Sequence, residues 1–153
     1  MSFDTKPGTH GARQPRGALA KLGNRMMARR IGRRPGVKVM GFDALVLTTI
    51  GRKSGAERMT PVGRFPGKDG SWLIVASAAG GPSNPDWYNN LATHPDQVRI
   101  TVDGETFDVR AEQLHGAERD EAWQQVTTIA PRFAQYQVKT DREIPVIRLV
   151  KRG

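Results

Sequence analysis

Three basic side chains, Arg52, Lys53 and Arg58, surround Ser54 in the stretch GRKSGAERMTP, residues 51–61. The apolar run ALVLTT comes just before them and is typical of a strand, so the basic group follows the end of that strand. Three cations on one turn repel one another unless an anion lies among them. A lysine point charge, planar guanidinium groups and two glycines that allow close backbone approach all suit a phosphate, and successive turn amides could add to the site. The residues alone also allow an ordinary hairpin turn with solvated charges.

A second candidate segment, VASAAGGPSNPDWYNNL, starts at the end of a predicted strand and continues into a predicted helix. Ala76 and Ser77 end the strand, and Gly80–Gly81 follow. Such small residues let a flat ring lie against the backbone, whose amides can bond its edge. Trp87 and Tyr88 on the helix are placed to wall such a site. The alternative is that Trp87 only anchors the helix to the core.

A third segment, PRFAQYQVKTDREIPV, places Phe133 and Tyr136 three residues apart, which predicts that they project from one face of a helical turn. A tyrosine hydroxyl above a pocket can deliver a proton or bond to a substrate carbonyl. The alternative is core packing, which we also expect for Trp123. The sequence places no base beside Ser77, and its three histidines lack the spacing of metal ligands, so we expect no metal.

Short β-rich runs fill the chain from residue 36 onward, and we expect six to seven antiparallel strands with flanking helices. Asp103–Gly104 predicts a hairpin between QVRITV and ETFDVRA, and PGKDG predicts another between TPVGRF and SWLIVAS. EIPVIRL predicts a last strand, and Pro145 within it indicates an edge or barrel-rim position. The absence of βαβ alternation favours a small antiparallel barrel over a doubly wound sheet.

Two helices are expected beside these strands. The stretch NPDWYNNLATHP predicts a short helix with Asn84 as its cap and Pro85 at its first position. The stretch GAERDEAWQQVTTIAP begins with acidic residues, which suits a helix N-terminus, and Pro131 ends it.

The net charge of +9 belongs entirely to the N-terminal region. Residues 1–40 hold ten Lys and Arg and one acid, whereas residues 41–153 hold fourteen of each sign. We therefore expect a flexible basic arm over 1–16, a cationic amphipathic helix over 17–35 and a barrel domain over 36–153. The helix would rest on anionic lipid or close one end of the barrel. A neutral body argues against nucleic acid as a partner.

The chain has no cysteine, which excludes disulfides and thiolate chemistry. We find no apolar run long enough to span a bilayer and no signal-peptide core. These features predict a cytoplasmic protein, either soluble or peripheral at the inner face of the cell membrane.

Three blocks in order, LTTIGRKSGAERMTPV, WLIVASAAGGPSNPDWYNNLATHP and FAQYQVKTDREIPVIRL, resemble the deazaflavin-dependent nitroreductase family. Its members are actinobacterial and related reductases that use coenzyme F420, an 8-hydroxy-5-deazaflavin. The resemblance runs from about residue 40 to the C-terminus. It implies a split β-barrel related to the FMN-binding reductases that resemble pyridoxamine phosphate oxidase.

The cofactor is long and polyanionic, since it carries a phosphodiester and an oligoglutamate tail. The resemblance implies that one group of residues binds the phosphate end, a second lines the passage toward the ring, and a third holds the ring. These groups are Arg52, Lys53, Ser54 and Arg58; Thr60 and Pro61; and Ala76, Ser77, Gly80, Gly81, Trp87, Tyr88 and Asn90.

Reduced deazaflavin donates hydride from C5, so the resemblance implies an oxidoreductase acting on a quinone, nitro or enone acceptor. Tyr136 and Ser77 are the candidate catalytic hydroxyl groups. Family members that activate nitroimidazoles tend to present several tyrosines in this segment, and Phe133 occupies one such position, which argues against nitroimidazole reduction. Because related proteins reduce quinones at the membrane, the resemblance implies a quinone as the acceptor. A basic arm would let a peripheral enzyme, monomer or homodimer, draw a lipid-soluble quinone from the bilayer.

Two alternatives stay open at the level of the sequence. One is a non-catalytic split-barrel protein that binds a cofactor or lipid. The other is an FMN-dependent reductase on the same fold.

Overall fold

The computed structural model describes residues 3–9, 11, 38–39 and 42–152. Eight strands, three α-helices and two 3₁₀ turns follow one another along this part of the chain: β1 Lys38–Val39, β2 Phe42–Ile50, β3 Glu57–Gly63, β4 Phe65–Pro66, η1 Lys68–Gly70, β5 Trp72–Val75, η2 Ala78–Gly80, α2 Asp86–Thr93, β6 Val98–Val102, β7 Glu105–Gln113, α3 Gly116–Ile129, α4 Arg132–Lys139 and β8 Val146–Lys151.

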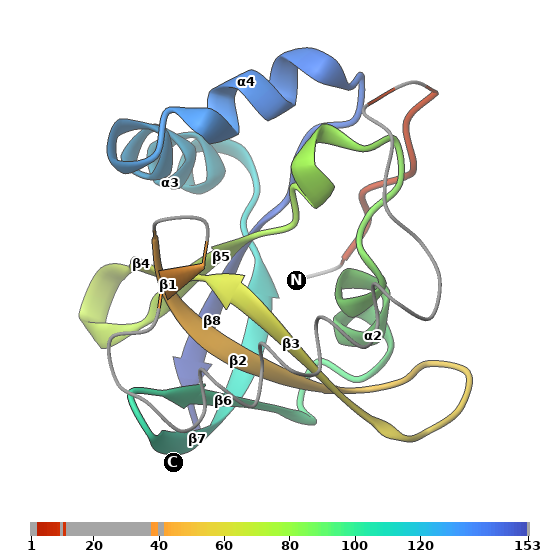
Figure 1. The fold of residues 1–153 in the computed structure, drawn as a ribbon, viewed down its shortest axis with the longest axis vertical. Helices are drawn as coiled ribbons and strands as arrows, with labels where there is room; N and C mark the ends of the chain where they lie inside the picture. The colour runs from red at the N-terminus through yellow and green to blue at the C-terminus, as the bar shows by residue number, and fades with distance from the viewer. Residues whose placement is uncertain (1–2, 10, 12–37, 40–41, 153) are drawn as a thin grey trace.

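The strands form one curled antiparallel sheet in the order β1-β2-β6-β7-β8-β5-β4, and β3 pairs with β2. Figure 1 shows the sheet wrapping around on itself, with α3 and α4 together above one end and α2 beside the sheet. The predicted mainly β, split-barrel fold with flanking helices is confirmed. Two of the eight strands, β1 and β4, contain only two residues each.

Both predicted hairpins are confirmed, and their turns have the expected backbone. Asp103 and Gly104 have φ angles of 50° and 86°, as a two-residue turn between twisted antiparallel strands requires. The connection between β4 and β5 contains Asp69 and Gly70, at φ angles of 56° and 76°. These turns fix the register of the strands that they join.

Two apolar clusters share the central strands. Successive strand residues point to opposite faces, so Ile74 packs inside the curl while Leu73 packs under the helices. The inner cluster also contains Leu45 and Ile147, and the outer one contains Val126 of α3. The sheet therefore supports a helix layer on one side and encloses its own core on the other.

One alternative for Pro145 and the predicted cap of the short helix are wrong. β8 pairs with β7 on one side and β5 on the other, so Pro145 is not on an edge strand, and the barrel-rim alternative is the one left. The strand begins at Val146, directly after Pro145, and this position removes no ladder hydrogen bond. Helix α2 begins at Asp86 with Pro85 as its N-cap residue, and Asn84 lies before the helix.

Trp123 lies at the margin of the outer cluster and is only partly buried. The guanidinium carbon of Arg119 lies 4.5 Å from the centre of its ring. The prediction that Trp123 is a core residue is therefore only partly correct.

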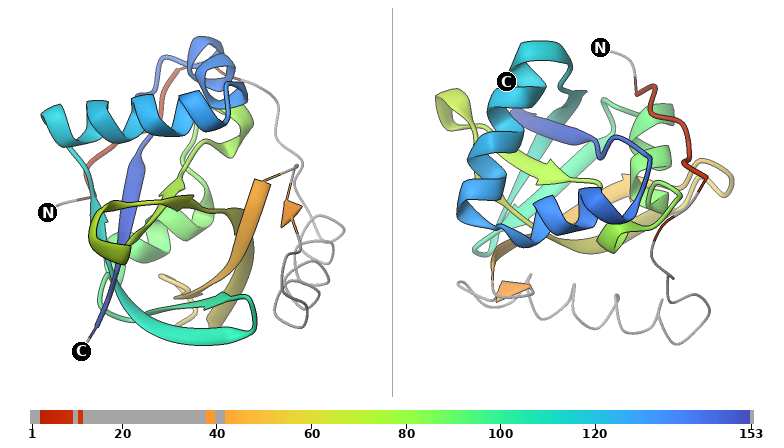
Figure 2. Two further views of the ribbon diagram at one scale, coloured as in Figure 1. Left: turned by 90° about the vertical axis from the view of Figure 1, so that its left-hand side faces the viewer. Right: turned by 90° about the horizontal axis from the view of Figure 1, so that it is seen from above.

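The N-terminal segment from Phe3 to Thr9 packs against the folded body. Figure 2 shows this red segment running along α2 in the view from above. The ring centroids of Phe3 and Tyr88 are 5.6 Å apart, and the Thr9 amide donates to Asp141 Oδ1 at 2.8 Å. These contacts hold residues 3–9 of the predicted arm against the body. The helix predicted over 17–35 lies outside the described residues.

Candidate functional site

The basic group is exposed to solvent: Arg52 and Lys53 lie in the turn between β2 and β3, and Arg58 lies at the start of β3, next to that turn. Among the described residues, no ion pair involves Arg52, Lys53 or Arg58. The nearby acid Glu57 forms its ion pair with Arg99 instead, since Glu57 Oε1 accepts from Arg99 Nη2 at 2.7 Å. Three like charges thus stand close together in sequence without an acidic partner in the described chain.

The backbone of this turn is largely satisfied within the protein. The Gly51 amide donates to Ala56 O at 2.7 Å, and the Gly55 amide donates to Gly51 O at 2.8 Å. The Arg52 amide donates to Asn90 Oδ1 at 3.1 Å. The amides of Gly51, Arg52 and Gly55 are therefore not free to form an anion-binding nest.

The Ser54 side chain forms two hydrogen bonds within the turn region. Its hydroxyl oxygen accepts from the Ala56 amide at 3.2 Å and from Arg58 Nη2 at 3.5 Å. A β-carbon on Gly51 would lie 2.7 Å from that oxygen, so a larger residue there would require the Ser54 hydroxyl to move. Ser54 thus holds the turn and Arg58 together, and its hydroxyl proton can still be donated to a ligand.

Asn90 fastens α2 to this turn. Its side chain is 7% exposed and donates from Nδ2 to Thr49 Oγ1 at 3.1 Å, while Oδ1 binds the Arg52 amide. Both ends of the amide are used within the protein. Asn90 therefore positions the basic turn, and its place beside the ring stays a prediction.

The strand register separates two residues that were expected to line one passage. Arg58 pairs with Thr49 and Thr60 pairs with Leu47, so Arg58 and Thr60 share a face of β3. Pro61 pairs with Val46 and points to the opposite face. Thr60 thus lies on the same side as the Arg58 side chain, and Pro61 does not.

The second predicted segment forms a tight turn after β5. Ala76 is fully buried, Ser77 is partly exposed, and Ala78 and Gly80 have φ angles of 47° and 82°. A β-carbon on Gly80 would lie 2.9 Å from the backbone oxygen of Tyr136. Gly80 is therefore required both for its positive φ and for the close packing of α4.

Trp87 and Tyr88 are buried in the inner cluster, with exposed fractions of 7% and 2%. The Tyr88 hydroxyl donates to Gln113 Oε1 at 2.6 Å and accepts from the Thr5 amide at 3.0 Å. Burial raises the pKa of Tyr88 above its usual value, against the opposing effect of the Thr5 hydrogen bonds. Both aromatic residues anchor α2, which is the alternative that the sequence left open for Trp87.

Phe133 and Tyr136 project from the same face of α4, as predicted, and their ring centroids are 5.6 Å apart at 89°. Both belong to the outer cluster, and Tyr136 is 9% exposed. The backbone of Tyr136 lies against Gly80. The structure thus brings the two segments that carry Ser77 and Tyr136 next to each other.

Sequence reasoning missed Arg142, which is 2% exposed and binds the turn after β5. One sequence signal was available. Arg142, Ile144 and Val146 follow a two-residue period, which places Arg142 in line with buried side chains. The sequence analysis also missed Gln113, whose buried side chain accepts a hydrogen bond from the Tyr88 hydroxyl.

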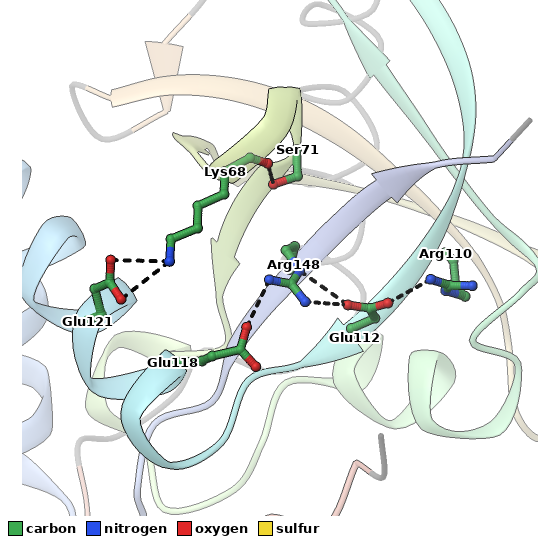
Figure 3. A network of polar contacts seen from close by, with 7 residues as sticks. All are labelled: Lys68, Ser71, Arg110, Glu112, Glu118, Glu121 and Arg148. Atoms are coloured by element: carbon green, nitrogen blue, oxygen red, sulfur yellow. Dashed lines mark hydrogen bonds and ion pairs between the residues drawn. The ribbon is translucent and has the colours of Figure 1, made fainter.

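A polar network lies on another part of the molecule (Figure 3). Arg148 bridges Glu112 at 2.8 Å and Glu118 at 3.1 Å, and Arg110 also bonds Glu112. A small cavity beside it is lined by Leu73, Glu118, Arg148 and neighbouring residues. Another cavity lies near Arg152. Neither contains a residue predicted for the site, and the acids around Arg148 leave it no free charge.

The fold is a split β-barrel, and the three basic side chains beside it have no acidic partner among the described residues. A sequence model described as F420H2-dependent quinone reductase matches residues 21–151. The chain belongs to the F420H2-dependent quinone reductase family.

Individual relatives agree with this assignment. An F420H2-dependent quinone reductase of Mycobacterium tuberculosis is 40% identical over 128 residues, which cover 80% of this chain and 81% of the relative. A solved F420H2-dependent reductase is 36% identical with a TM-score of 0.63 and covers 74% of this chain and 99% of that chain. A second structure, described as a domain-swapped dimer, is 32% identical with a TM-score of 0.64 and covers 86% and 96%.

The family decides between the alternatives that the sequence left open. The protein is an oxidoreductase, and its cofactor is coenzyme F420. Neither a non-catalytic binding protein nor an FMN-dependent reductase agrees with this membership.

Proposed function

We propose that this protein transfers a hydride from F420H2 to a quinone, binding the phosphate end of the cofactor on the β2–β3 turn and its ring against the Ala76–Gly81 turn. Bound F420H2 supplies the hydride at C5 of its deazaflavin ring. Reduction of a quinone to a hydroquinone takes up one hydride and one proton. The names of the relatives support a quinone as the acceptor.

The unpaired charges of the β2–β3 turn carry this proposal. Arg52, Lys53 and Arg58 have no acidic partner in the described chain, and Glu57 is neutralised by Arg99. A phosphodiester with a carboxylate tail would remove their mutual repulsion and would gain charge-assisted hydrogen bonds. The residues present therefore fit the anionic part of F420.

At the reacting end, we assign the proton and the acceptor contact to the hydroxyl groups of Ser77 and Tyr136. Ser77 lies in the turn after β5, and the backbone of Tyr136 packs on Gly80 of the same turn. Either hydroxyl can donate a hydrogen bond to a quinone oxygen as negative charge develops on it.

The test compares a Lys53→Ala/Arg58→Ala double variant with the parent. Each charge-assisted hydrogen bond contributes about 1.5–3 kcal/mol, so the Kd for F420 should rise at least about tenfold. Binding is measured by quenching of cofactor fluorescence, and turnover by the absorbance change when F420H2 is oxidised by a menaquinone analogue. The saturated rate should change little, because the reacting end is untouched.

A Lys68→Ala/Lys151→Ala variant is the matched control, because it removes the same charge from positions outside the β2–β3 turn. An equal loss of affinity in both variants would show that only net charge matters. Parental affinity in the Lys53/Arg58 variant would refute the assignment of the phosphate end.

We also propose that residues 17–35 associate with anionic membrane surfaces, where the quinone would be taken up. The basic residues of this region and the lipid solubility of long-chain quinones support it. Among the described residues, no helix is long and apolar enough to span a bilayer. Sedimentation with anionic vesicles tests the association.

A further inference from the structure

The guanidinium group of Arg142 is completely enclosed and uses all five of its N–H donors. Nη1 donates to Ala76 O at 2.9 Å and to Asn84 Oδ1 at 2.7 Å. Nη2 donates to Ser77 O at 2.8 Å and to Gly81 O at 3.2 Å, and Nε donates to Gly81 O at 3.4 Å. Arg142 itself is 2% exposed.

The positive charge of Arg142 is buried, and neither of its sequence neighbours Asp141 and Glu143 forms an ion pair with it in the described structure. No ion pair of Arg142 occurs within the part of the chain that the structure describes. Burial lowers the pKa of Arg142, but a guanidinium starts so high that it stays charged at neutral pH. Arg119, another buried arginine, has Glu143 at 3.9 Å and the Trp123 ring at 4.5 Å.

Burying an unpaired charge is costly, and neutral acceptors offset only part of that cost. All but one of the acceptors that hold Arg142 are backbone carbonyls of the turn after β5. A fold that needed only packing at this position would be served by an apolar side chain. The arrangement therefore points to a role for the charge itself or for the turn that it holds.

Arg142 fixes the direction of the peptide units in this turn. In a trans peptide the C=O and the following N–H point in opposite directions. Because the Ala76 carbonyl points at Arg142, the amide of Ser77 points away from it. The strained φ of 47° at Ala78 persists only where surrounding contacts over-determine the backbone, and the bonds to Ser77 O and Gly81 O supply such contacts.

We propose that Arg142 is a positioning residue for the deazaflavin ring: it holds the Ala76–Gly81 turn in its binding conformation and places a fixed positive charge behind the ring. This inference rests on the proposed function, which locates the ring at that turn. The charge favours the anionic form of the ring, whose 8-hydroxyl group is acidic. A cation separated from the ring by one layer of backbone acts through a medium that screens poorly.

The test uses Arg142→Gln and Arg142→Lys, with Arg119→Lys as the matched control at another buried arginine. Circular dichroism and thermal unfolding first establish that each variant is folded. Fluorescence titration then gives the Kd for oxidised F420. Absorbance of the bound cofactor as a function of pH gives the pKa of its ring hydroxyl, a quantity that a merely structural role would not change.

In Arg142→Gln, the pKa of the bound ring hydroxyl should rise by about one unit, and the Kd for the anionic ring should rise about tenfold. Arg142→Lys keeps the charge but has three donors in place of five, so its bound pKa should match the parent while its Kd rises several-fold. Arg119→Lys should change neither quantity.

A folded Arg142→Gln variant with parental Kd and parental bound pKa would overturn the inference. If that variant does not fold, Arg142→Lys decides, and a parental Kd for it would overturn the inference as well. Failure of the parent protein to bind F420 would instead refute the proposed function, and the inference with it. Parental binding that is insensitive to Arg142 would refute only the role of Arg142.

Discussion

Among individual residues, Glu112 shows most directly how a fixed ion pair links protonation to stability. Its carboxylate accepts from Arg148 at 2.8 Å and from Arg110 at 2.8 Å, and its side chain is 18% exposed. The hydrogen bond from Arg148 lowers the pKa of Glu112, against the opposing effect of burial. The folded protein therefore releases this proton more readily than the unfolded chain does.

The sign of the pH dependence follows from that difference. At a pH above about 4.3, the value for an unfolded glutamate, the full stabilisation is present. As the pH falls below this value, the unfolded chain takes up the proton first and the stabilisation is lost. We expect Glu112→Gln to be less stable at pH 7 and to lose less stability than the parent between pH 5 and 3.

Urea unfolding of both proteins at several pH values measures this difference. Glu105→Gln is the control, because Glu105 is an exposed glutamate on the same strand. A stability difference between parent and Glu112→Gln that stays constant from pH 7 to pH 3 would contradict the expectation.

Among the elements, the N-terminal segment of residues 3–9 makes the least local set of contacts. Thr5 alone exchanges hydrogen bonds with Tyr88, Asn84 and Gln113. The Gly8 amide donates to Pro82 O at 2.6 Å. The segment thus joins α2 to the loop before it and to β7, and it reaches Asp141 through Thr9.

We expect the substitution Gly8→Ala to weaken the packing of residues 3–9 against the body. A β-carbon on Gly8 would clash with Asp141 Oδ1 and lie 3.0 Å from the backbone nitrogen of Arg142, so the segment must shift. Because the contacts of Gly8 itself lie outside both apolar clusters, the unfolding temperature should change by only a few degrees, as expected for about 1 kcal/mol. Hydrogen exchange at residues 3–9 should become faster.

Mass-spectrometric hydrogen exchange measures the effect, and limited proteolysis gives an independent check. Gly63→Ala is the matched control, because a β-carbon there meets only ordinary contacts, the nearest at 3.7 Å. Unchanged exchange of residues 3–9 in Gly8→Ala would show that the segment is not held as the contacts indicate.

Over the whole molecule, charge and packing are unevenly distributed. The two apolar clusters share strands β5 and β8, so the curl and the helix layer form one folded body. The excess of positive charge lies in residues 1–40, apart from the neutral remainder. This separation allows the membrane proposal to be tested without disturbing the fold of the body.

The variant Arg25→Gln/Arg29→Gln/Arg30→Gln removes three charges from the predicted amphipathic helix and leaves residues 3–9 intact. Each basic residue near an anionic surface contributes about 1 kcal/mol, so the partition coefficient should fall about a hundredfold. Co-sedimentation with phosphatidylserine-containing vesicles measures it. The control Lys68→Gln/Arg132→Gln/Lys139→Gln removes three exposed charges of the body, and an equal fall in the control would contradict a specific role of residues 17–35.

The sequence predicted the features that depend on neighbouring residues. Asp103–Gly104 fixed one hairpin, because positive φ angles at both positions are a local requirement. The basic turn was visible because its three cations lie within seven residues, and the three ordered blocks identified the family. The resemblance also supplied the split barrel and the cofactor, which composition and spacing left open.

Only the tertiary structure decided which side chains are buried and what they bind. Arg142 bonds to Ala76, 66 positions away, and Thr9 bonds to Asp141, 132 positions away. Trp87 and Tyr88 became anchors of α2 because partners from remote strands and from the N-terminal segment enclose them. The free energy of burying a charge or hydroxyl depends on the donors and acceptors that surround it, and these come together only when distant segments pack.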